Sequence, residues 1–495
     1  MKILSKLYDP MYDMFCKLKY MIYFKMFLNM LIINYCYYKI WGVKNNKLLQ
    51  ALNHTIKLNG CIIIKLIQLY NSNIELINDT SNNEFMIQMF SQYYENCPIH
   101  ELEYTKKLFF SEFGYSFDEY FKLDETFSVK SGSVAQVYKG YINANNTEVA
   151  IKVVHPEIEY QLITPHAFVK IYTFLMSRFK CLRKYETVLQ LENFFVNLNK
   201  QINMENEFNN NEYFYNNYSN NHIITIPKPL MKSKNFLIME FIDGEALESM
   251  QISDYRKQII ISFIGIFIKD NFLFGKYIHC DLHEANWKVL KHINNNSDNI
   301  TYKIVIYDFG YVIENSLHDD IKKFLYYLDT YNVYELGSAL FNKIKNLDLD
   351  DLNSVSYKKD FLARFTANNK HIHPYSSGML TYGLRFCYMN NYKLDSRLTE
   401  YLITITLLNK NFSKYVFVNL DNMNNNYNYI YNTNMFYIII CEKYNIFHNM
   451  VEYMRNTYIN DPFFLTKKTY VNNHFDTLET DNKILDKAEN INIDI

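Results

Sequence analysis

Two aspartates and an asparagine carry the clearest chemistry in this sequence. Asp281 and Asn286 share one loop after an apolar run, and Asp308 opens the triplet Asp308-Phe309-Gly310. This spacing suits phosphoryl transfer, because the aspartate reaches a substrate hydroxyl while the asparagine oxygen ligates Mg²⁺. Asp308 would be the second metal ligand. Asp and Asn are also common in loops for turn-forming reasons, so each motif alone is weak.

A lysine on a predicted strand supplies the matching phosphate contact. Lys152 lies in the run Val149-Ala150-Ile151-Lys152-Val153, at the expected separation from Val137 in the preceding loop. A strand lysine is usually solvated, but one in this context is a candidate to pair with the α- and β-phosphates and a helix glutamate. Lys130, Gly132 and Ala135 stand where a glycine-rich loop would have three glycines. The loop is a poor phosphate cradle by sequence, although small residues still let backbone N–H groups approach an anion.

The elements that position these residues follow from hydrophobic periodicity. Helices are expected over residues 1 to about 124, 157–182, 186–218 and from 251, with Ile259–Phe274 buried. Strands are expected over Val134–Tyr141, Glu148–Val154, Ile223–Pro227, Phe236–Phe241 and Tyr302–Tyr307. The helix over 186–218 carries Glu205 and Glu207 on a polar face, which is solvated by default.

Composition bounds the class of protein. A chain of 495 residues suggests two to four modules, and 49% hydrophobic residues can bury a sizeable core. The net charge of −1 gives no field that favours nucleic acid. None of the 8 cysteines has C-x-x-C or zinc-ligand spacing, which favours free thiols in a reducing intracellular compartment.

No segment predicts a membrane span, a signal peptide or a transit peptide. The apolar run Met26–Tyr38 is shorter than the roughly 20 residues that a spanning helix needs. It predicts an amphipathic helix that packs on the domain, with a membrane-surface helix as the alternative. The compartment otherwise stays open.

Taken together, the motifs resemble those of the UbiB-type atypical kinases, a protein-kinase-like family associated with ubiquinone biosynthesis. The segments that carry the resemblance are Ser131–Tyr138, Val149–Pro156, Phe236–Gly244, His279-x-Asp281-x-His283-x-x-Asn286 and Asp308-Phe309-Gly310. The resemblance implies an α+β, bilobal kinase-like fold with a helical N-terminal extension. The expected parts are the extension (1–124), a β-rich N-lobe with a helical insertion (125–247), a helical C-lobe (248–420) and a low-complexity, polar tail (421–495).

The resemblance also implies roles for individual residues. Lys152 contacts phosphate and pairs with Glu207, Asp281 is the catalytic aspartate, and Asn286 and Asp308 bind Mg²⁺. The remaining residues expected to contact ATP are Ser131, Gly132, Ser133, Val134, Ala135, Val137, Ala150 and Glu240. The implied activity is Mg-ATP-dependent, either ATP hydrolysis or phosphoryl transfer to a small-molecule or lipid-related acceptor, with a lipid or isoprenoid-quinone-pathway partner and peripheral membrane contact through the N-terminal helices. A protein serine/threonine kinase and a nucleotide-binding pseudokinase scaffold are the alternatives.

Departures from the family pattern, and one from protein kinases in general, bear on this interpretation. The family's K-x-G-Q signature aligns with Lys65-Leu66-Ile67-Gln68, so isoleucine replaces its glycine. Gln201 and Asn203 stand where family members have an acidic pair, which removes charge pairing with Lys65. Cys280 fills the position of the arginine that reads activation-loop phosphorylation in many kinases, so activation of that kind is not supported.

Overall fold

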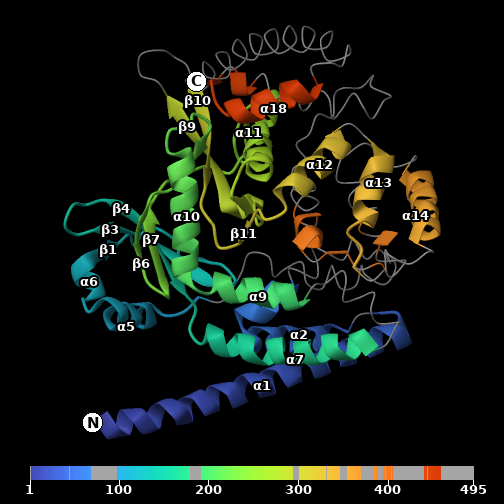
Figure 1. Cartoon of the computed structure of the whole chain (residues 1–495). Helices are drawn as coiled ribbons and strands as arrows, with labels where there is room; N and C mark the ends of the chain where they lie inside the picture. The colour runs from blue at the N-terminus through green and yellow to red at the C-terminus, as the bar shows by residue number, and fades with distance from the viewer. Residues whose placement is uncertain are drawn as a thin grey trace. The chain divides into compact units, whose positions relative to one another are not determined.

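The computed structural model divides the chain into two compact units, one of residues 1–210 and 228–241 and the other of 211–227 and 242–495. Each unit is described by itself (Figure 1). The structure describes residues 2–43, 45–67, 97, 99–178, 191–293, 300–329, 332–345, 354–369, 384, 386–387, 392, 394–395, 397–402, 404, 437, 440–442 and 444–458. The polar run Asn294–Asn299 lies outside this set, as do residues 421–434 and the last thirty residues of the predicted low-complexity, polar tail. The four-part division of the chain stays a prediction.

Long helices open the first unit. α1 (Lys2–Trp41) packs along α2 (Asn46–Asn59) and along α7 (Ile158–Arg178) (Figure 1). Asn45 caps α2 by accepting hydrogen bonds from two backbone N–H groups of its first turn. Gly60 ends α2 at a φ of 75°, a conformation that favours glycine, and a Cβ there would collide with the side chain of Gln161. The expectation of a helical start to the chain is confirmed for these residues.

Glu157 ties α1 to the start of α7. Its carboxylate accepts hydrogen bonds from Lys19 Nζ at 2.6 Å, Tyr20 OH at 2.8 Å and Tyr12 OH at 2.9 Å. The φ of Glu157 is 58°, which is strained for a residue with a side chain. The three contacts from α1 offset that strain. The Met26–Tyr38 segment of α1 packs on the domain as predicted, because Phe27 and its neighbours join a buried cluster with Leu52 and Ile56 of α2.

The first unit contains an antiparallel sheet in the order β1-β3-β4-β7-β6, with β2 paired to β3. The strands are β1 (Phe121–Leu123), β2 (Lys130–Ser131), β3 (Ala135–Ile142), β4 (Glu148–Val154), β6 (Pro229–Lys232) and β7 (Phe236–Glu240). The predicted hairpin is β3 and β4, although Val134 lies in the turn rather than in the strand. β1 and β6 are short strands that the sequence did not predict.

Alternation along β4 separates two cores. Val149, Ile151 and Val153 pack with α5 (Leu102–Phe113) and α6 (Phe117–Tyr120) on one face of the sheet. Ala150 and Val154 pack on the other face with residues of α7 and α9 (Leu191–Gln201). The period of two therefore places Lys152 on the face that these two helices cover.

The prediction of one helix over 186–218 is wrong for the described residues. α9 ends at Gln201 and α10 (Met204–Tyr218) begins three residues later. The break falls at Asn203, whose side chain accepts a hydrogen bond from the Glu205 N–H at 3.0 Å. An asparagine at this position caps the new helix, because its short polar side chain competes with the helical backbone.

The second unit carries two small sheets and most of the remaining helices. The strands are β5 (Ile224–Thr225), β9 (Trp287–Ile293) and β10 (Ile300–Ile306) in one sheet, and β8 (Tyr277–His279) and β11 (Val312–Glu314) in the other. The helices are α11 (Asp254–Leu273), α12 (His318–Asp329), α13 (Val333–Phe341), α14 (Ser354–Asn369) and α18 (His448–Tyr458). The buried helix predicted over Ile259–Phe274 is α11, capped by Ser253. The strand predicted over Ile223–Pro227 is shorter, and it pairs parallel with β10.

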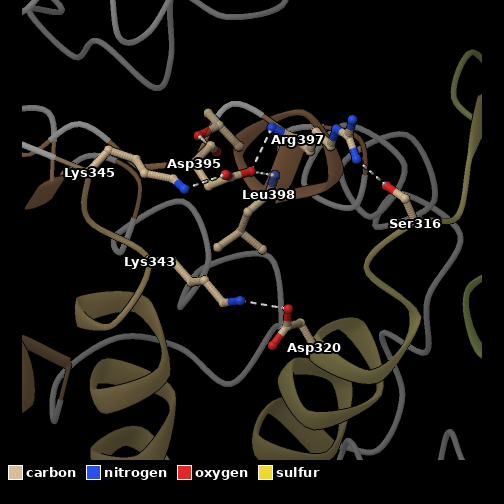
Figure 2. Close-up of polar contacts among 8 residues, drawn as sticks. Ser316, Asp320, Lys343, Lys345, Asp395, Arg397 and Leu398 are labelled. Atoms are coloured by element: carbon tan, nitrogen blue, oxygen red, sulfur yellow. Dashed lines mark hydrogen bonds and ion pairs between the residues drawn. The ribbon is translucent and has the colours of Figure 1, made fainter.

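Figure 2 shows the polar contacts of the segment around Asp395 with Lys345, which follows α13, and with Ser316, which precedes α12. The Asp395 carboxylate accepts from the N–H groups of Arg397 (3.1 Å) and Leu398 (3.3 Å) and so begins the helix at 397–402. Lys345 Nζ lies 3.3 Å from the same carboxylate. Arg397 in turn donates to Ser316 Oγ at 3.1 Å. Asp395 therefore caps the start of this helix and binds Lys345, while Arg397 attaches the helix to the chain after β11.

The described cysteines are free thiols, and Cys181 lies outside the described residues. Among the helices that the structure describes, none combines the length and the apolar character needed to cross a membrane.

Candidate functional site

Lys152 and Glu207 form a buried ion pair in the first unit. Lys152 Nζ donates to Glu207 Oε1 at 2.7 Å, and the side chains are 10% and 1% exposed. Lys152 comes from β4 and Glu207 from the first turns of α10. The default expectation of a solvated Glu207 is wrong, while the pairing implied by the family resemblance is present. A buried charge requires such a partner, because an unpaired one is costly to desolvate.

The loop between β2 and β3 has a defined backbone. The Gly132 N–H donates to Ala135 O at 3.0 Å, and the His155 N–H donates to Val134 O at 3.0 Å. A Cβ on Gly132 would lie 3.5 Å from Ala135 O, which is an ordinary contact. Glycine is therefore not required here by sterics. Ser131 and Ser133 are each partly exposed on the loop.

The apolar residues predicted to contact ATP share one face of this sheet. Ala135 and Ala150 are buried in one cluster with Met239, and Val134 and Val137 pack against it. They lie on the same face as Lys152.

Glu240 lies at the end of β7, opposite Val149. Its N–H donates to Lys228 O at 2.9 Å, and its exposed carboxylate accepts from the Lys228 N–H at 3.4 Å. The side chain of Glu240 thus binds backbone at the end of β7. A role of Glu240 in nucleotide binding stays a prediction.

In the second unit, His279 joins the two acidic segments. His279 Nε2 lies 2.6 Å from Asp308 O, and the Asp281 N–H lies 3.2 Å from His279 Nδ1. A carbonyl only accepts, so Nε2 carries the hydrogen and Nδ1 accepts from Asp281. Burial lowers the pKa of His279, which favours this neutral form. One neutral imidazole therefore fixes the backbone of both segments.

Asn286 is oriented by the same loop. Its side-chain N–H donates to Asp281 O at 2.6 Å, which assigns the amide and aims its carbonyl oxygen away from that backbone. The Asn286 N–H donates to His283 O at 2.8 Å, and its own carbonyl accepts from the Tyr307 N–H at 3.0 Å. Asn286 is thus held between the Asp281 loop and the end of β10. Its side chain is buried.

Asp308 and His283 complete the arrangement. Asp308 Oδ1 accepts from the Gly310 N–H at 2.9 Å, and Phe309 is buried against His279 and against Phe214 of α10. His283 Nε2 lies 3.8 Å from Asp281 Oδ1, and both side chains are partly exposed. The pair leaves the Asp281 carboxylate accessible, as a group that contacts a substrate must be.

These donors fit a Mg²⁺ site that nucleotide phosphates would complete. Among the described residues, no three His, Cys, Asp or Glu side chains converge on a common point as a protein-only metal cage would require. Mg²⁺ commonly takes one or two protein oxygens and fills its remaining positions with water and phosphate. Asn286 and Asp308 offer a carboxamide oxygen and a carboxylate of that kind.

The structure brings the predicted residues together within each unit. The first unit assembles Lys152, Glu207 and the loop, and the second assembles Asp281, Asn286 and Asp308. In the K-x-G-Q-like segment, Lys65 is half-buried, Ile67 is buried, and Gln68 lies outside the described residues. Sequence reasoning gave no role to His279. Its signal was the immediate proximity to Asp281, but the contact with Asp308 depends on the pairing of β8 with β11.

A sheet with a buried lysine–glutamate pair, and a second unit in which an aspartate–asparagine loop meets an Asp-Phe-Gly segment, define a kinase-like protein. Residues 92–334 match the family model described as the ABC1 atypical kinase-like domain. The chain therefore carries an ABC1 atypical kinase-like domain, and its resemblance to the UbiB-type kinases is confirmed. The α+β, kinase-like fold with N-terminal helices is confirmed with it.

Several curated proteins are similar to part of this chain. The chain is 27% identical over 251 residues to "Probable serine/threonine-protein kinase abkC" of Dictyostelium discoideum, covering 48% of this chain and 34% of that protein. It is 24% identical over 228 residues to "ABC1 family protein MCP2 homolog" of Schizosaccharomyces pombe, covering 44% and 39%. The chain thus spans little more than a third of the length of these relatives.

Solved structures with a related shape include the Rv3197–erythromycin complex from Mycobacterium tuberculosis, at a TM-score of 0.42 and 14% identity over 70% of this chain and 87% of that one. The Rio2 kinase–ADP/Mg²⁺–phosphoaspartate complex from Chaetomium thermophilum has a TM-score of 0.28 and 11% identity over 68% and 86%. At these scores the likeness carries no argument of its own. The assignment rests on the family match and on the site geometry.

Proposed function

We propose that this protein binds Mg-ATP and either hydrolyses it or transfers its terminal phosphoryl group to a small-molecule or lipid-related acceptor. The observation that carries the proposal is the buried contact of 2.7 Å between Lys152 and Glu207. A lysine held in this way on the central strand is positioned to bind phosphate as a fixed charge. The family match over residues 92–334 supports the same activity.

The residues have separate tasks in this proposal. Lys152 binds the α- and β-phosphates and is oriented by Glu207. Asp281 accepts the proton of the attacking hydroxyl or water, while His279 holds its backbone. Asn286 and Asp308 hold Mg²⁺, which when bound neutralises charge on the triphosphate. The short apolar side chains around Ala135 and Ala150 offer a surface for the adenine ring.

We also propose that α1 lies against a lipid surface, which bears on the nature of the acceptor. One stripe of α1 is buried, and another exposes large apolar side chains at Phe15, Leu18 and Ile22. Their spacing of three and four residues places them on one face of the helix. An exposed stripe of large apolar side chains on one helix face favours an interaction with lipid or with a partner protein.

A protein serine/threonine kinase remains the second candidate, because a curated relative carries that name. We test both with γ-labelled ATP, using the full chain, a lipid extract and a panel of proteins. We expect label in a lipid or small-molecule fraction, and less in the Asp281→Asn variant. Label on protein alone would favour the protein kinase, and released phosphate alone would favour the ATPase.

Nucleotide-induced thermal stabilisation without turnover in any fraction would favour the pseudokinase scaffold. That outcome would contradict the catalytic part of the proposal while leaving nucleotide binding intact. Absence of both stabilisation and turnover would contradict the proposal entirely.

A further inference from the structure

A buried histidine holds the carbonyl of the candidate phosphate loop. His155 follows β4, and its Nε2 lies 3.0 Å from Gly132 O and 3.4 Å from Ser131 Oγ. A carbonyl oxygen only accepts, so His155 Nε2 must carry the hydrogen. Burial lowers the pKa of His155, which favours the neutral ring, and the hydrogen bond to Gly132 opposes this in part. In the neutral ring Nδ1 is then an acceptor.

A second histidine satisfies that acceptor. His100 Nδ1 lies 3.1 Å from His155 Nδ1, so His100 is the donor, and its own Nε2 becomes an acceptor 3.0 Å from Thr105 Oγ1. Burial lowers the pKa of His100 to about 4, with a smaller contribution from His155, and the ring is therefore neutral at ordinary pH. The Gly132 carbonyl at one end of this chain of hydrogen bonds therefore fixes the tautomers of both His155 and His100.

The same logic extends to the sheet. Thr105 donates to His100, so its oxygen accepts from Tyr138 OH at 3.1 Å. Tyr138 OH in turn accepts from the side-chain amide of Gln136, whose Oε1 accepts from the His100 N–H at 2.9 Å. The second N–H of the Gln136 amide donates to His100 O at 3.1 Å, and Gln136 and Thr105 are fully buried. The chain of hydrogen bonds therefore has one direction, and it ends on the Gly132 carbonyl.

The direction of that carbonyl fixes the next N–H. In a trans peptide the C=O and N–H groups point opposite ways, so a Gly132 carbonyl turned toward His155 turns the Ser133 N–H away from it. His155 connects through His100 and Thr105 to Tyr138, which belongs to the core on the α5 face of the sheet. Lys152 lies on the opposite face.

We propose that His155, oriented by His100, is a positioning residue that turns the Gly132–Ser133 peptide so that the Ser133 N–H is presented to a nucleotide phosphate on the Lys152 side of the loop. This rests on the proposed nucleotide binding. It assigns to a histidine and a backbone N–H part of what a glycine-rich loop does in other kinases. It also explains how a loop with a single glycine keeps a defined conformation.

The test compares His155→Leu, which removes the donor, with His155→Gln, whose amide N–H takes the place of Nε2–H. His166→Leu is the matched control, because His166 stacks on Phe195 elsewhere in the same unit. Two quantities are measured on the full chain: backbone hydrogen exchange of residues 130–137 without nucleotide, and the Kd of a fluorescent ATP analogue with Mg²⁺.

We expect His155→Leu to speed exchange of the loop and to weaken the analogue about tenfold, the effect of one lost hydrogen bond to a charged group. His155→Gln should stay within about twofold of the parent protein, and His166→Leu should leave both quantities unchanged. Unchanged loop exchange or an unchanged Kd in folded His155→Leu would overturn the inference. Failure of His155→Gln to rescue would also overturn it.

Two further results separate this inference from the proposed function. If the parent protein binds no analogue but His155→Leu still speeds exchange of the loop, nucleotide binding fails and the orientation of the loop by His155 stands. If His155→Leu does not fold, Thr105→Val removes the hydroxyl at the far side of His100 while keeping its shape. We expect that variant to speed loop exchange to a smaller extent, and no change there would contradict the inference.

Discussion

Lys152 and Glu207 compensate each other's charge in the interior of the first unit. Removal of one partner of a buried ion pair leaves an uncompensated charge and costs about 3–5 kcal/mol. We therefore expect Glu207→Leu to lower the apparent free energy of unfolding by about 3 kcal/mol. The Lys152→Met/Glu207→Leu double variant should recover most of that loss, because neither charge remains.

The measurement is chemical denaturation of Lys152→Met, Glu207→Leu, the double variant and the parent protein. The double variant should be stable yet unable to bind nucleotide. Additive losses in the double variant would contradict the paired, buried state of these side chains.

At the scale of residues, the sequence predicted which residue types form the candidate site and how they are spaced, but not which side chains touch. Lys152, Asp281, Asn286 and Asp308 could be found because their motifs are local. Their assignment to nucleotide and metal stays a prediction. The contact of His100 with His155 could not be found, because the two residues are joined only when the chain before α5 meets the end of β4. Periodicity alone missed the burial of Glu207, because the residue lies in a polar run and its partner Lys152 is distant in the sequence.

At the scale of elements, a hydrogen bond to a partly buried carboxyl group joins α10 and α11. Tyr218 OH donates to Asp270 Oδ2 at 2.7 Å. Burial raises the pKa of Asp270 from 3.8 to about 6, although the Tyr218 hydrogen bond opposes the shift. Because the folded pKa is raised, the stabilisation is complete below pH 4 and is lost as the pH rises through 6.

We therefore expect the parent protein to lose about 3 kcal/mol relative to Asp270→Asn between pH 4 and pH 7, at about 1.4 kcal/mol for each unit of pKa. Urea denaturation of both proteins across this range is the measurement. Parallel pH profiles for the two proteins would show that Asp270 titrates at its ordinary pKa.

The exposed stripe of α1 gives a second prediction for an element. We expect the Phe15→Ser/Ile22→Ser variant to sediment with lipid vesicles several-fold less than the parent protein, because each change removes apolar area from the contact. Ile99→Ser, which alters an exposed apolar residue outside α1, is the matched control. Equal sedimentation of all three proteins would remove the lipid contact from the proposal.

Elements with regular periodicity were predicted well, and those that depend on partners were not. The β-branched run Glu148–Val154 and the apolar run of α11 are both long enough to indicate a buried element directly. β5 has two residues and no periodicity, so its pairing with β10 could not be predicted. The break before α10 had a local signal in Asn203, but asparagine is too common in this chain for that signal to stand out.

At the scale of the whole molecule, the chain divides its chemistry between two units. The first provides the lysine–glutamate pair and the small-residue loop, and the second provides Asp281, Asn286 and Asp308. The proposed nucleotide turnover requires both sets of residues. The activity of the intact chain is therefore the most direct test of the account.

That test is ATP turnover by the full chain, with and without Mg²⁺, compared with Asp308→Asn. Asp319→Asn is the control, because Asp319 lies exposed on α12 and the site does not include it. We predict Mg²⁺-dependent turnover that Asp319→Asn retains and Asp308→Asn lowers about a hundredfold. Turnover that is equal in Asp308→Asn, or that does not depend on Mg²⁺, would contradict the central claim.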